Sequence, residues 1–278
     1  MRSLFCRRLI LQFCFIAILF YFFSVDLVLF SQAKKENPKK GLPPQILNFS
    51  PLSIPAAGQP IKVTVSGFRL EQATSATIAD GRGKVRILGK SRKIKPPKDD
   101  LVPKFGDSEI DLEVTLSSMT VSKNLKLTLK SNAGESKPHE LIVRGNEKYI
   151  MEKEPNQSFA SAQTLTLPII VEGKIQSAKD VDVFQFPAKK GETLLCKVEA
   201  QILGSPAELI LYLHDRQGKL LQVARAQALA KDPEMKVVIP HDGIYYLSAL
   251  DANDLGNNSC GYLFYLSLET QNSKKPSK

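Results

Sequence analysis

The chain is poor in the residues from which most active sites are built. Its 278 residues include three histidines and four cysteines. His139 starts an apolar run, His214 precedes a turn and His241 lies inside one, so the three share no motif. No Gly-x-Ser-x-Gly, His-Glu-x-x-His or phosphate-loop pattern occurs. These absences exclude the usual serine hydrolase, zinc peptidase and P-loop signatures, and we expect a protein that is not an enzyme.

The first 33 residues have the composition of an export signal. Arginines at positions 2, 7 and 8 precede an apolar run over 9–23, and small residues at 31 and 33 match a signal-peptidase site. A second apolar patch at 27–30 leaves open an uncleaved anchor, in which case only this segment contacts a membrane. Either way, we expect the folded part to be secreted, periplasmic or at the cell surface.

Two cysteines remain once residues 1–33 are removed, and they are Cys196 and Cys260. An exported domain with two thiols favours one disulfide. Two buried free cysteines are the alternative, because pairing geometry cannot be derived from sequence. Their spacing does not match a metal-binding pair.

The formal charge of +10 is distributed unevenly. Residues 1–33 carry +2, residues 34–148 carry +9 and residues 149–278 carry −1, which indicates a boundary near residue 148. Nine Lys or Arg side chains lie in 82–104. This stretch is either a basic patch for an anionic surface or a solvated hairpin and loop. It contains no aromatic residue, which argues against nucleic acid as a partner.

The hydrophobic pattern predicts an all-β fold with two β-sandwich domains. Period-two alternation marks strands around 61–65, 110–116 and 125–129, and 44–146 has no convincing amphipathic helix. The second half has about eight strand-like runs, compatible with a two-sheet jelly roll, and one helical turn is predicted within 159–165. The predicted divisions are a linker at 34–43, an immunoglobulin-like domain at 44–147, a jelly-roll-like sandwich at 148–270 and a disordered tail at 271–278.

The opening of the first domain resembles an IPT/TIG domain, an immunoglobulin-like sandwich. The stretch "PQILNFSPLSIPAAGQPIKVTVSGFRL" has the proline-led first strand, the Ser50-Pro51 turn, Gly58 in a second turn and a strand that ends in Gly67-Phe68. The resemblance implies a spacer or an interaction module.

Residues 152–269 resemble the bacterial pre-peptidase C-terminal domain, a β-sandwich appended to many secreted proteases and surface proteins. The matching motifs occur in order: "EKEPNQSFASAQ", "VEGKIQSAKDVDVFQF", "KKGETL", "LILYLHDRQGKLL", "IPHDGIYYLSALDA" and "YLFYLSLE". The collagen-binding surface of some members needs exposed aromatic residues across one sheet. Here the candidates for such a surface are Tyr245, Tyr246, Tyr262 and Tyr265, but alternation would bury some of each pair. The consecutive Tyr245 and Tyr246 must face opposite sides of a strand.

Two acidic segments are candidates for a calcium site. On an extended segment Glu152, Glu154 and Asn156 project to one side, and calcium prefers such oxygen ligands. In calcium-binding members of the resembled family, notably the collagen-binding domains of clostridial collagenases, these two regions supply the ligands. The resemblance therefore implies a Ca²⁺ site formed by Glu152, Glu154, Asn156, Ser177, Asp180 and Asp182.

This sequence departs from the family pattern at two points, which leaves a second interpretation open. Gln157 stands where members with a site usually have Asp or Asn, and the spacing around Asp180 and Asp182 differs. The same residues could instead stabilise turns and helix caps, with carboxylates that accept hydrogen bonds from backbone N–H groups.

We therefore expect an exported, non-catalytic binding, adhesion or scaffold protein of the bacterial cell envelope. We expect it to bind Ca²⁺ if the acidic site exists and to have no cofactor otherwise. Its expected partner is a cell-envelope protein or a polysaccharide. The alternatives are a structural spacer without a specific ligand and an accessory subunit of a separate secreted hydrolase.

Overall fold

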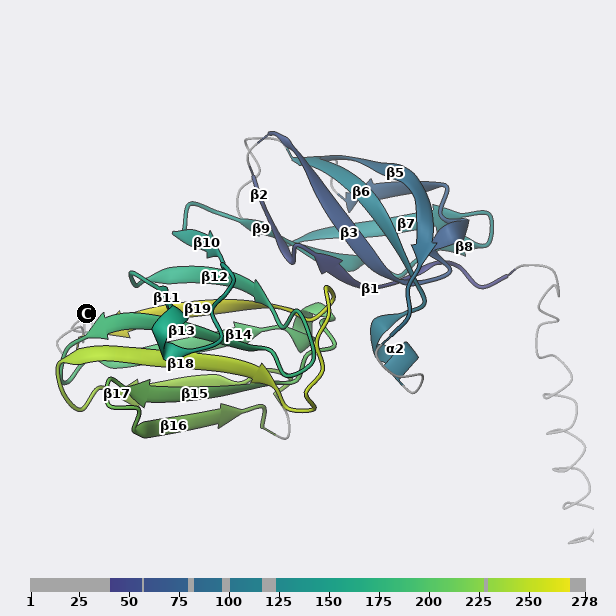
Figure 1. The fold of residues 1–278 in the computed structure, drawn as a ribbon. Coiled ribbons are helices and arrows are strands. Elements are labelled where there is room, and N and C mark those ends of the chain that lie inside the picture. The colour runs from purple at the N-terminus through teal and green to yellow at the C-terminus, as the bar shows by residue number, and fades with distance from the viewer. Residues whose placement is uncertain are drawn as a thin grey trace, which may run out of the picture. The chain divides into compact units, whose positions relative to one another are not determined.

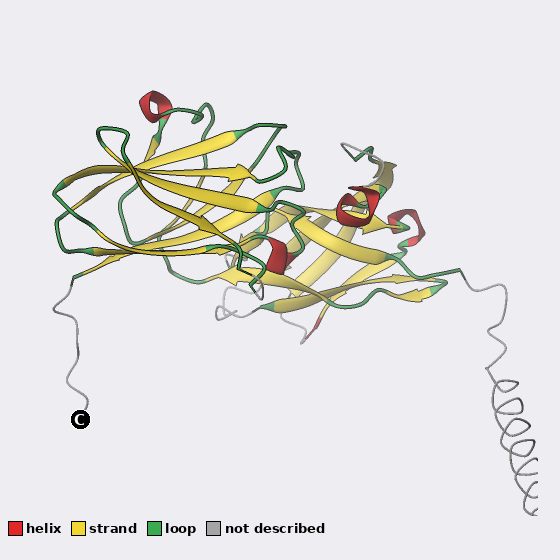
Figure 2. Cartoon of the chain, turned by 90° about the horizontal axis from the view of Figure 1, so that it is seen from below, coloured by secondary structure: helices red, strands yellow, loops and turns green. Residues whose placement is uncertain are grey.

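A computed structural model describes residues 41–56, 58–79, 83–96, 101–116, 124–227 and 230–270. The predicted signal 1–33, most of the linker 34–43 and the tail 271–278 lie outside these residues. The described residues from 42 onward belong to one compact unit. Nearly every described element is a strand, and the few helices have only three or four residues each (Figure 2). Within the described residues, no helix has the length and apolar character needed to cross a membrane.

The first sandwich consists of two sheets, as Figure 1 shows. One sheet has the order β1 (Gln45–Ser50), β3 (Pro60–Phe68), β6 (Ser108–Leu116) and β5 (Gly83–Lys93). The other has the order β2 (Ser53–Pro55), β9 (His139–Arg144), β7 (Leu125–Ser131) and β4 (Ser75–Ile78), with β8 (Gly134–Glu135) beside β7. Two short helices, η1 (Leu70–Gln72) and α2 (Val102–Phe105), lie in its connections.

Alternating side chains form the core of this sandwich, as the sequence predicted. In β6 every second residue is buried, so Ile110, Leu112 and Val114 pack inward. The charged residues of β6 face outward instead. There they pair with the basic strand β5: Arg86 contacts Glu113 at 2.7 Å, and Arg92 contacts Glu109 and Asp111. The described part of the basic stretch thus lies partly in ion pairs on a solvated face.

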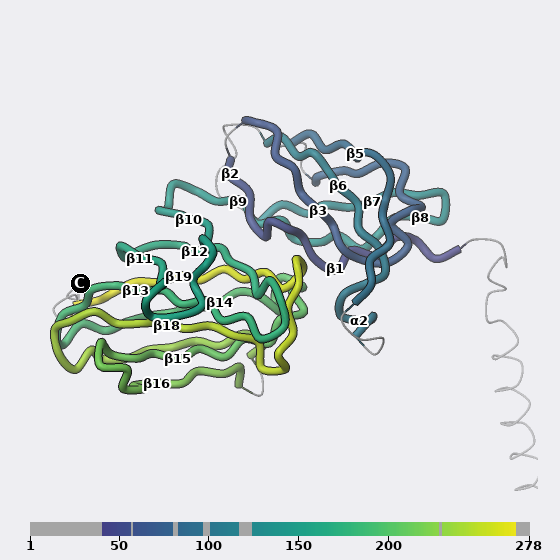
Figure 3. Tube along the Cα trace, viewed as in Figure 1, coloured from purple at the N-terminus to yellow at the C-terminus, as the bar shows by residue number. Residues whose placement is uncertain are grey.

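The second sandwich consists of two five-stranded sheets. The first has the order β10 (Tyr149–Met151), β12 (Ile169–Lys174), β19 (Gly261–Glu269), β14 (Thr193–Glu199) and β17 (Glu234–Val238). The second has the order β11 (Gln163–Thr164), β13 (Val181–Ala188), β18 (Gly243–Asp251), β15 (Leu209–Asp215) and β16 (Leu220–Arg225). From β10 to β13 the chain alternates between the two sheets, a path that can be followed in Figure 3.

Two details of this half differ from the sequence-based expectation or sharpen it. It contains ten strands rather than about eight, because the short segments β10 and β11 pair in parallel with β12 and β13. The predicted helical turn is η4 (Phe159–Ser161), and a second turn, η5 (Gln201–Leu203), follows β14. A capping box between Ser158 and Ser161 explains why η4 begins where it does.

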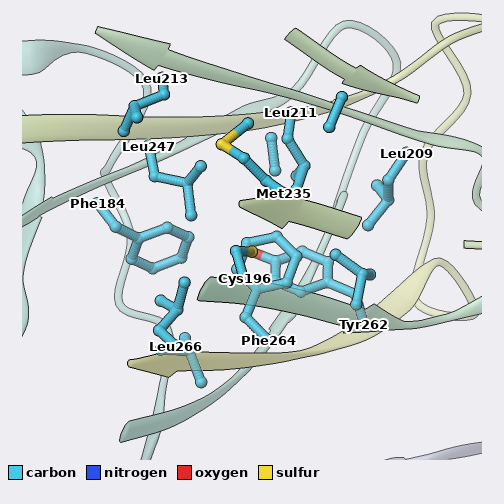
Figure 4. Packing of buried hydrophobic residues seen from close by; sticks show 14 of the residues in the cluster. Phe184, Cys196, Leu209, Leu211, Leu213, Met235, Leu247, Tyr262, Phe264 and Leu266 are labelled. Atoms are coloured by element: carbon cyan, nitrogen blue, oxygen red, sulfur yellow. The ribbon is translucent and has the colours of Figure 1, made fainter. Parts of the chain in front are cut away.

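Large apolar side chains fill the space between these sheets. Phe184, Tyr262 and Phe264 gather there with leucines from β15 and β18 (Figure 4). Tyr245 is fully buried while Tyr246 is half-buried, which confirms that the consecutive tyrosines face opposite sides. Cys196 and Cys260 are buried free thiols. The favoured disulfide is therefore not formed in the structure, which contains the alternative of two free thiols, and burial raises the pKa of each thiol to about 12.

The two sandwiches contact each other through buried groups. Phe105 of α2, which follows β5, is fully buried in the hydrophobic core of the second sandwich. Asn48 of β1 donates a hydrogen bond to the carbonyl oxygen of Ser259 at 2.6 Å. Glu172 of β12 accepts bonds from the backbone N–H of Leu52 and from the Ser53 hydroxyl, each at 2.6 Å. We call this set of contacts the joint.

Candidate metal centre

Three carboxylates from two segments meet beside β12. Glu152 and Glu154 follow the end of β10, and Asp182 lies near the start of β13. One oxygen from each carboxylate lies within 4.8 Å of the others. Glu154 is exposed, Glu152 is half-buried and Asp182 is fully buried. The two glutamates of the first segment and the aspartate of the second thus form an acidic cluster. Its burial increases from the exposed Glu154 to the buried Asp182.

Tyr262 of β19 lies between two of these carboxylates. Its hydroxyl oxygen is 2.8 Å from Glu152 Oε2 and 2.7 Å from Asp182 Oδ2. A phenol has one proton to donate, so it can satisfy only one of the two acceptors at a time. Sequence reasoning considered Tyr262 only as a surface aromatic and missed this role. Its inward position in β19 was the available signal.

Gly173 of β12 provides the space in which these groups meet. It pairs with Tyr262 across the two strands. A Cβ atom added at position 173 would overlap the Tyr262 hydroxyl and Glu152 Oε2. The missing side chain, rather than any unusual backbone conformation, is what this position needs. Glu152 is also fixed by strand β12, because the backbone N–H of Lys174 donates a hydrogen bond to Glu152 Oε1 at 2.7 Å.

The cluster is electrostatically strained without a positive charge. Burial, followed by the negative charge of Glu152, raises the pKa of Asp182 to about 9. Burial also raises the pKa of Glu152. At neutral pH the carboxylate pair therefore retains a proton when no cation neutralises it. A divalent cation would supply the opposite charge and release that proton.

Asn156 contributes buried polar atoms that have no partner. Its side chain is fully buried, and among the described residues neither its Oδ1 nor its Nδ2 has a hydrogen-bond partner. The same holds for Asp182 Oδ1. Leaving a buried polar group unpaired costs about 1–3 kcal/mol. The carboxylates of Glu152, Glu154 and Asp182 and the amide oxygen of Asn156 are the kind of oxygen ligand that calcium prefers, so the residues present fit the ion.

The backbone of this segment is well anchored. The N–H of Asn156 donates to Glu154 Oε2 at 3.0 Å, and the Gln157 amide donates to the same oxygen at 2.5 Å. The carbonyl of Asn156 accepts from the N–H of Val183 at 2.9 Å, directly beside Asp182. The departure from the family pattern at Gln157 thus places a donor against Glu154, where an acidic residue would have placed a further ligand.

The two remaining candidates take part in a turn. Asp180 Oδ2 accepts a bond from the N–H of Gln176 at 2.6 Å, and the Asp180 N–H donates to the Ser177 carbonyl at 3.2 Å. Asp180 does not belong to the group of three carboxylates, and Ser177 is exposed. The structure therefore brings together the carboxylates of three of the six predicted residues, with the backbone of Asn156 beside them, while Ser177 and Asp180 take part in the turn before β13.

No protein-family model matches the chain, and no curated protein matches it. Several solved structures are similar to it. One is the pre-peptidase C-terminal domain of a Bacillus anthracis collagenase, with 16% identity and a TM-score of 0.31 over 42% of this chain and 100% of that chain. Another is a periplasmic inhibitor of g-type lysozyme from Aeromonas hydrophila, with 11% identity and a TM-score of 0.29 over 44% and 96%.

A third similar structure is a Bacteroides ovatus protein of a mixed-linkage glucan utilization locus, solved with a heptasaccharide. It has 8% identity and a TM-score of 0.23 over 71% of each chain. One match is thus a domain of the kind predicted for residues 152–269, while the predicted IPT/TIG domain stays a prediction. Likeness at these levels concerns the β fold and assigns no activity, partner or location.

Proposed function

We propose that this chain is an exported, non-catalytic binding or scaffold protein of the bacterial cell envelope, with a calcium ion bound at the acidic cluster of its second sandwich. Glu152, Glu154, Asn156 and Asp182 would hold the ion. The observation that carries the calcium site is the cluster of three carboxylates, together with two buried oxygens, Asn156 Oδ1 and Asp182 Oδ1, that have no hydrogen-bond partner among the described residues. In this proposal the two sandwiches are an IPT/TIG-like module and a pre-peptidase C-terminal-like module.

Calcium at this cluster would act on structure rather than on chemistry. It would neutralise carboxylates that are held close together, two of which have a raised pKa. It would also connect the segment after β10 to the start of β13, which belong to different sheets. An ion that binds the folded chain and not the unfolded chain stabilises the fold, by about 2.7 kcal/mol at a hundredfold excess over its dissociation constant.

The test is a calcium titration by calorimetry on the chain that begins at residue 34, with melting temperatures measured with calcium and with a chelator. The Asp182→Asn variant removes one charged ligand with little change in shape. Asp254→Asn is the matched control, because Asp254 is exposed and its φ of 56° is a conformation that Asn also tolerates.

We expect binding near one-to-one and a higher melting temperature in the wild type and in the control, and neither in Asp182→Asn. Absence of heat and of a melting shift in the wild type would overturn the calcium site. These residues would then serve only to stabilise turns and helix caps, and a structural spacer without a specific ligand would become the better interpretation.

A further inference from the structure

The second sandwich has a cavity that is bordered by β12, β19 and the segment before β10. Its volume is about 390 Å³. Its wall includes Glu147 and Lys148 before β10, Pro168 just before β12, Ile170 in β12, and Tyr265 and Ser267 in β19. Tyr262 and Tyr265 are three residues apart on one strand, so their side chains point to opposite faces. The residues that line the cavity do not include Glu152, Glu154 or Asp182, so it is separate from the acidic cluster.

Tyr265 is fixed in place by its neighbours. Its hydroxyl donates to Glu199 Oε2 at 2.9 Å, and Glu199 Oε1 in turn accepts from Lys197 Nζ at 2.7 Å. Lys197 Nζ also lies 5.7 Å from the centre of the Tyr265 ring. Because the hydroxyl is already bonded, Tyr265 offers the cavity the surface of its ring. A half-buried aromatic ring with a fixed orientation is a good platform for a flat ligand.

The rest of the wall combines apolar and polar groups without a net charge. Pro168 and Ile170 extend the apolar surface, and Ile170 is the cross-strand partner of Tyr265. Glu147 and Lys148 are exposed and carry opposite charges. Ser267 adds a hydroxyl that both donates and accepts.

This combination selects among ligand classes. A purely apolar ligand would bury the two charges against it, which costs free energy. A polyanion would meet Glu147, and a polycation would meet Lys148. A sugar ring presents a C–H face to an aromatic ring and hydroxyl groups to charged and polar side chains. The volume lies in the range of about 300–1,000 Å³ that is usual for small-molecule sites.

We propose that this cavity is a carbohydrate subsite that binds one or two sugar rings of a neutral polysaccharide, with the Tyr265 ring as the stacking platform. The inference rests on the proposed function of a binding protein and names its ligand class, but it does not depend on the calcium site. Glu147, Lys148 and Ser267 provide hydrogen bonds to the sugar hydroxyls.

The test is electrophoresis of the chain from residue 34 through native gels that contain a soluble polymer. The neutral probes are a β-glucan, glycogen, a galactomannan and glycol chitin. The comparison probes are polygalacturonate, as a polyanion, and gelatin, as a protein. Tyr265→Ala removes the ring, while Tyr265→Phe keeps the ring and loses only the bond to Glu199. Tyr246→Ala is the matched control, because Tyr246 is a half-buried tyrosine on the outer face of the other sheet.

We expect at least one neutral polymer to retard the wild type, Tyr265→Phe and Tyr246→Ala, and to bind Tyr265→Ala about tenfold or more weakly. Circular dichroism and urea unfolding check that Tyr265→Ala remains folded. If that variant is unfolded, Ser267→Trp, which fills the cavity, replaces it and should abolish retardation.

Three outcomes would overturn the subsite. They are no retardation of the wild type by any neutral polymer, equal retardation of Tyr265→Ala and wild type, and retardation only by polygalacturonate or gelatin. If gelatin alone retarded the protein, the proposed binding function would stand with a different partner. If calcium bound but no polymer retarded the protein, the proposed metal centre would stand. Either result separates failure of the subsite from failure of the proposed function.

Discussion

Glu172 is the side chain on which the joint between the two sandwiches depends most. It is 1% exposed and accepts three hydrogen bonds: from the N–H of Leu52, from the Ser53 hydroxyl and, at 2.9 Å, from the Tyr149 hydroxyl. Arg144 lies 3.7 Å from the same carboxylate and 3.5 Å over the ring of Tyr149. One buried carboxylate thus connects strands of both sandwiches.

We expect Glu172→Ala to lower the free energy of unfolding by about 3 kcal/mol. Three donors lose their acceptor, and each unpaired buried group costs about 1–3 kcal/mol. Two effects reduce the sum. Water can enter the vacated space, and the fold no longer has to bury a charge, a cost reflected in the raised pKa of Glu172. Breaking a buried ion pair by removing one partner usually costs about 3–5 kcal/mol, which agrees with this value.

The assay is urea unfolding at pH 7, followed by circular dichroism and tyrosine fluorescence. Glu113→Ala is the control, because Glu113 also bonds to an arginine, Arg86, at 2.7 Å but on an exposed face. An exposed pair contributes about 1 kcal/mol at most. If Glu172→Ala cost no more than Glu113→Ala, the carboxylate would not hold the joint, and the reasoning from its three bonds would be wrong.

The remaining predictions concern the acidic cluster and the joint. Gly173→Ala should abolish calcium binding in calorimetry and cost about 1–3 kcal/mol in urea unfolding, because the added methyl group overlaps Tyr262; unchanged calcium affinity would contradict this. In the presence of a chelator, the free energy of unfolding should fall as the pH rises from about 4 to 9, because Asp182 in the folded chain keeps a proton that the unfolded chain has released. Urea midpoints that do not change with pH would contradict this prediction. Calcium should reduce this slope. Phe105→Ala should cost about 3–5 kcal/mol by the same assay, and exposed Arg86→Ala should cost much less; similar losses would contradict the insertion of Phe105.

Local periodicity was enough to predict the sandwich architecture. The alternation of 110–116 places Ile110, Leu112 and Val114 on one face because side chains in a strand alternate, and the structure confirms it. The same rule separated Tyr245 from Tyr246. Long-range contacts were beyond it. Nothing near Phe105 indicates which of two cores it joins, and a glutamate at position 172 is typical of a solvent-facing position until Leu52 and Ser53 are known to lie against it.

The acidic cluster was predictable to the extent that its carboxylates are close in sequence. Glu152 and Glu154 are two residues apart, and their carboxylates meet as that spacing predicted, whereas the metal ion itself stays a prediction. Asp180 and Asp182 have the same spacing, yet only Asp182 joins the cluster. Asp180 bonds to the N–H of Gln176 within its own turn, and such short-range competition is invisible in spacing alone.

Strand β12 connects the metal centre to the joint. Its consecutive residues alternate between the two features: Glu172 faces the joint, and Gly173 makes space for the acidic cluster. The N–H of Glu152 donates to the carbonyl of Glu172 at 2.9 Å, and the N–H of Lys174 donates to the Glu152 side chain. A change in the position of Glu152 therefore acts on the strand that carries Glu172. Because coupling free energies are reciprocal, an ion that orders Glu152 also stabilises the joint, and a well-formed joint increases the affinity for the ion. The proposed calcium ion would in this way set how firmly the two sandwiches are held together.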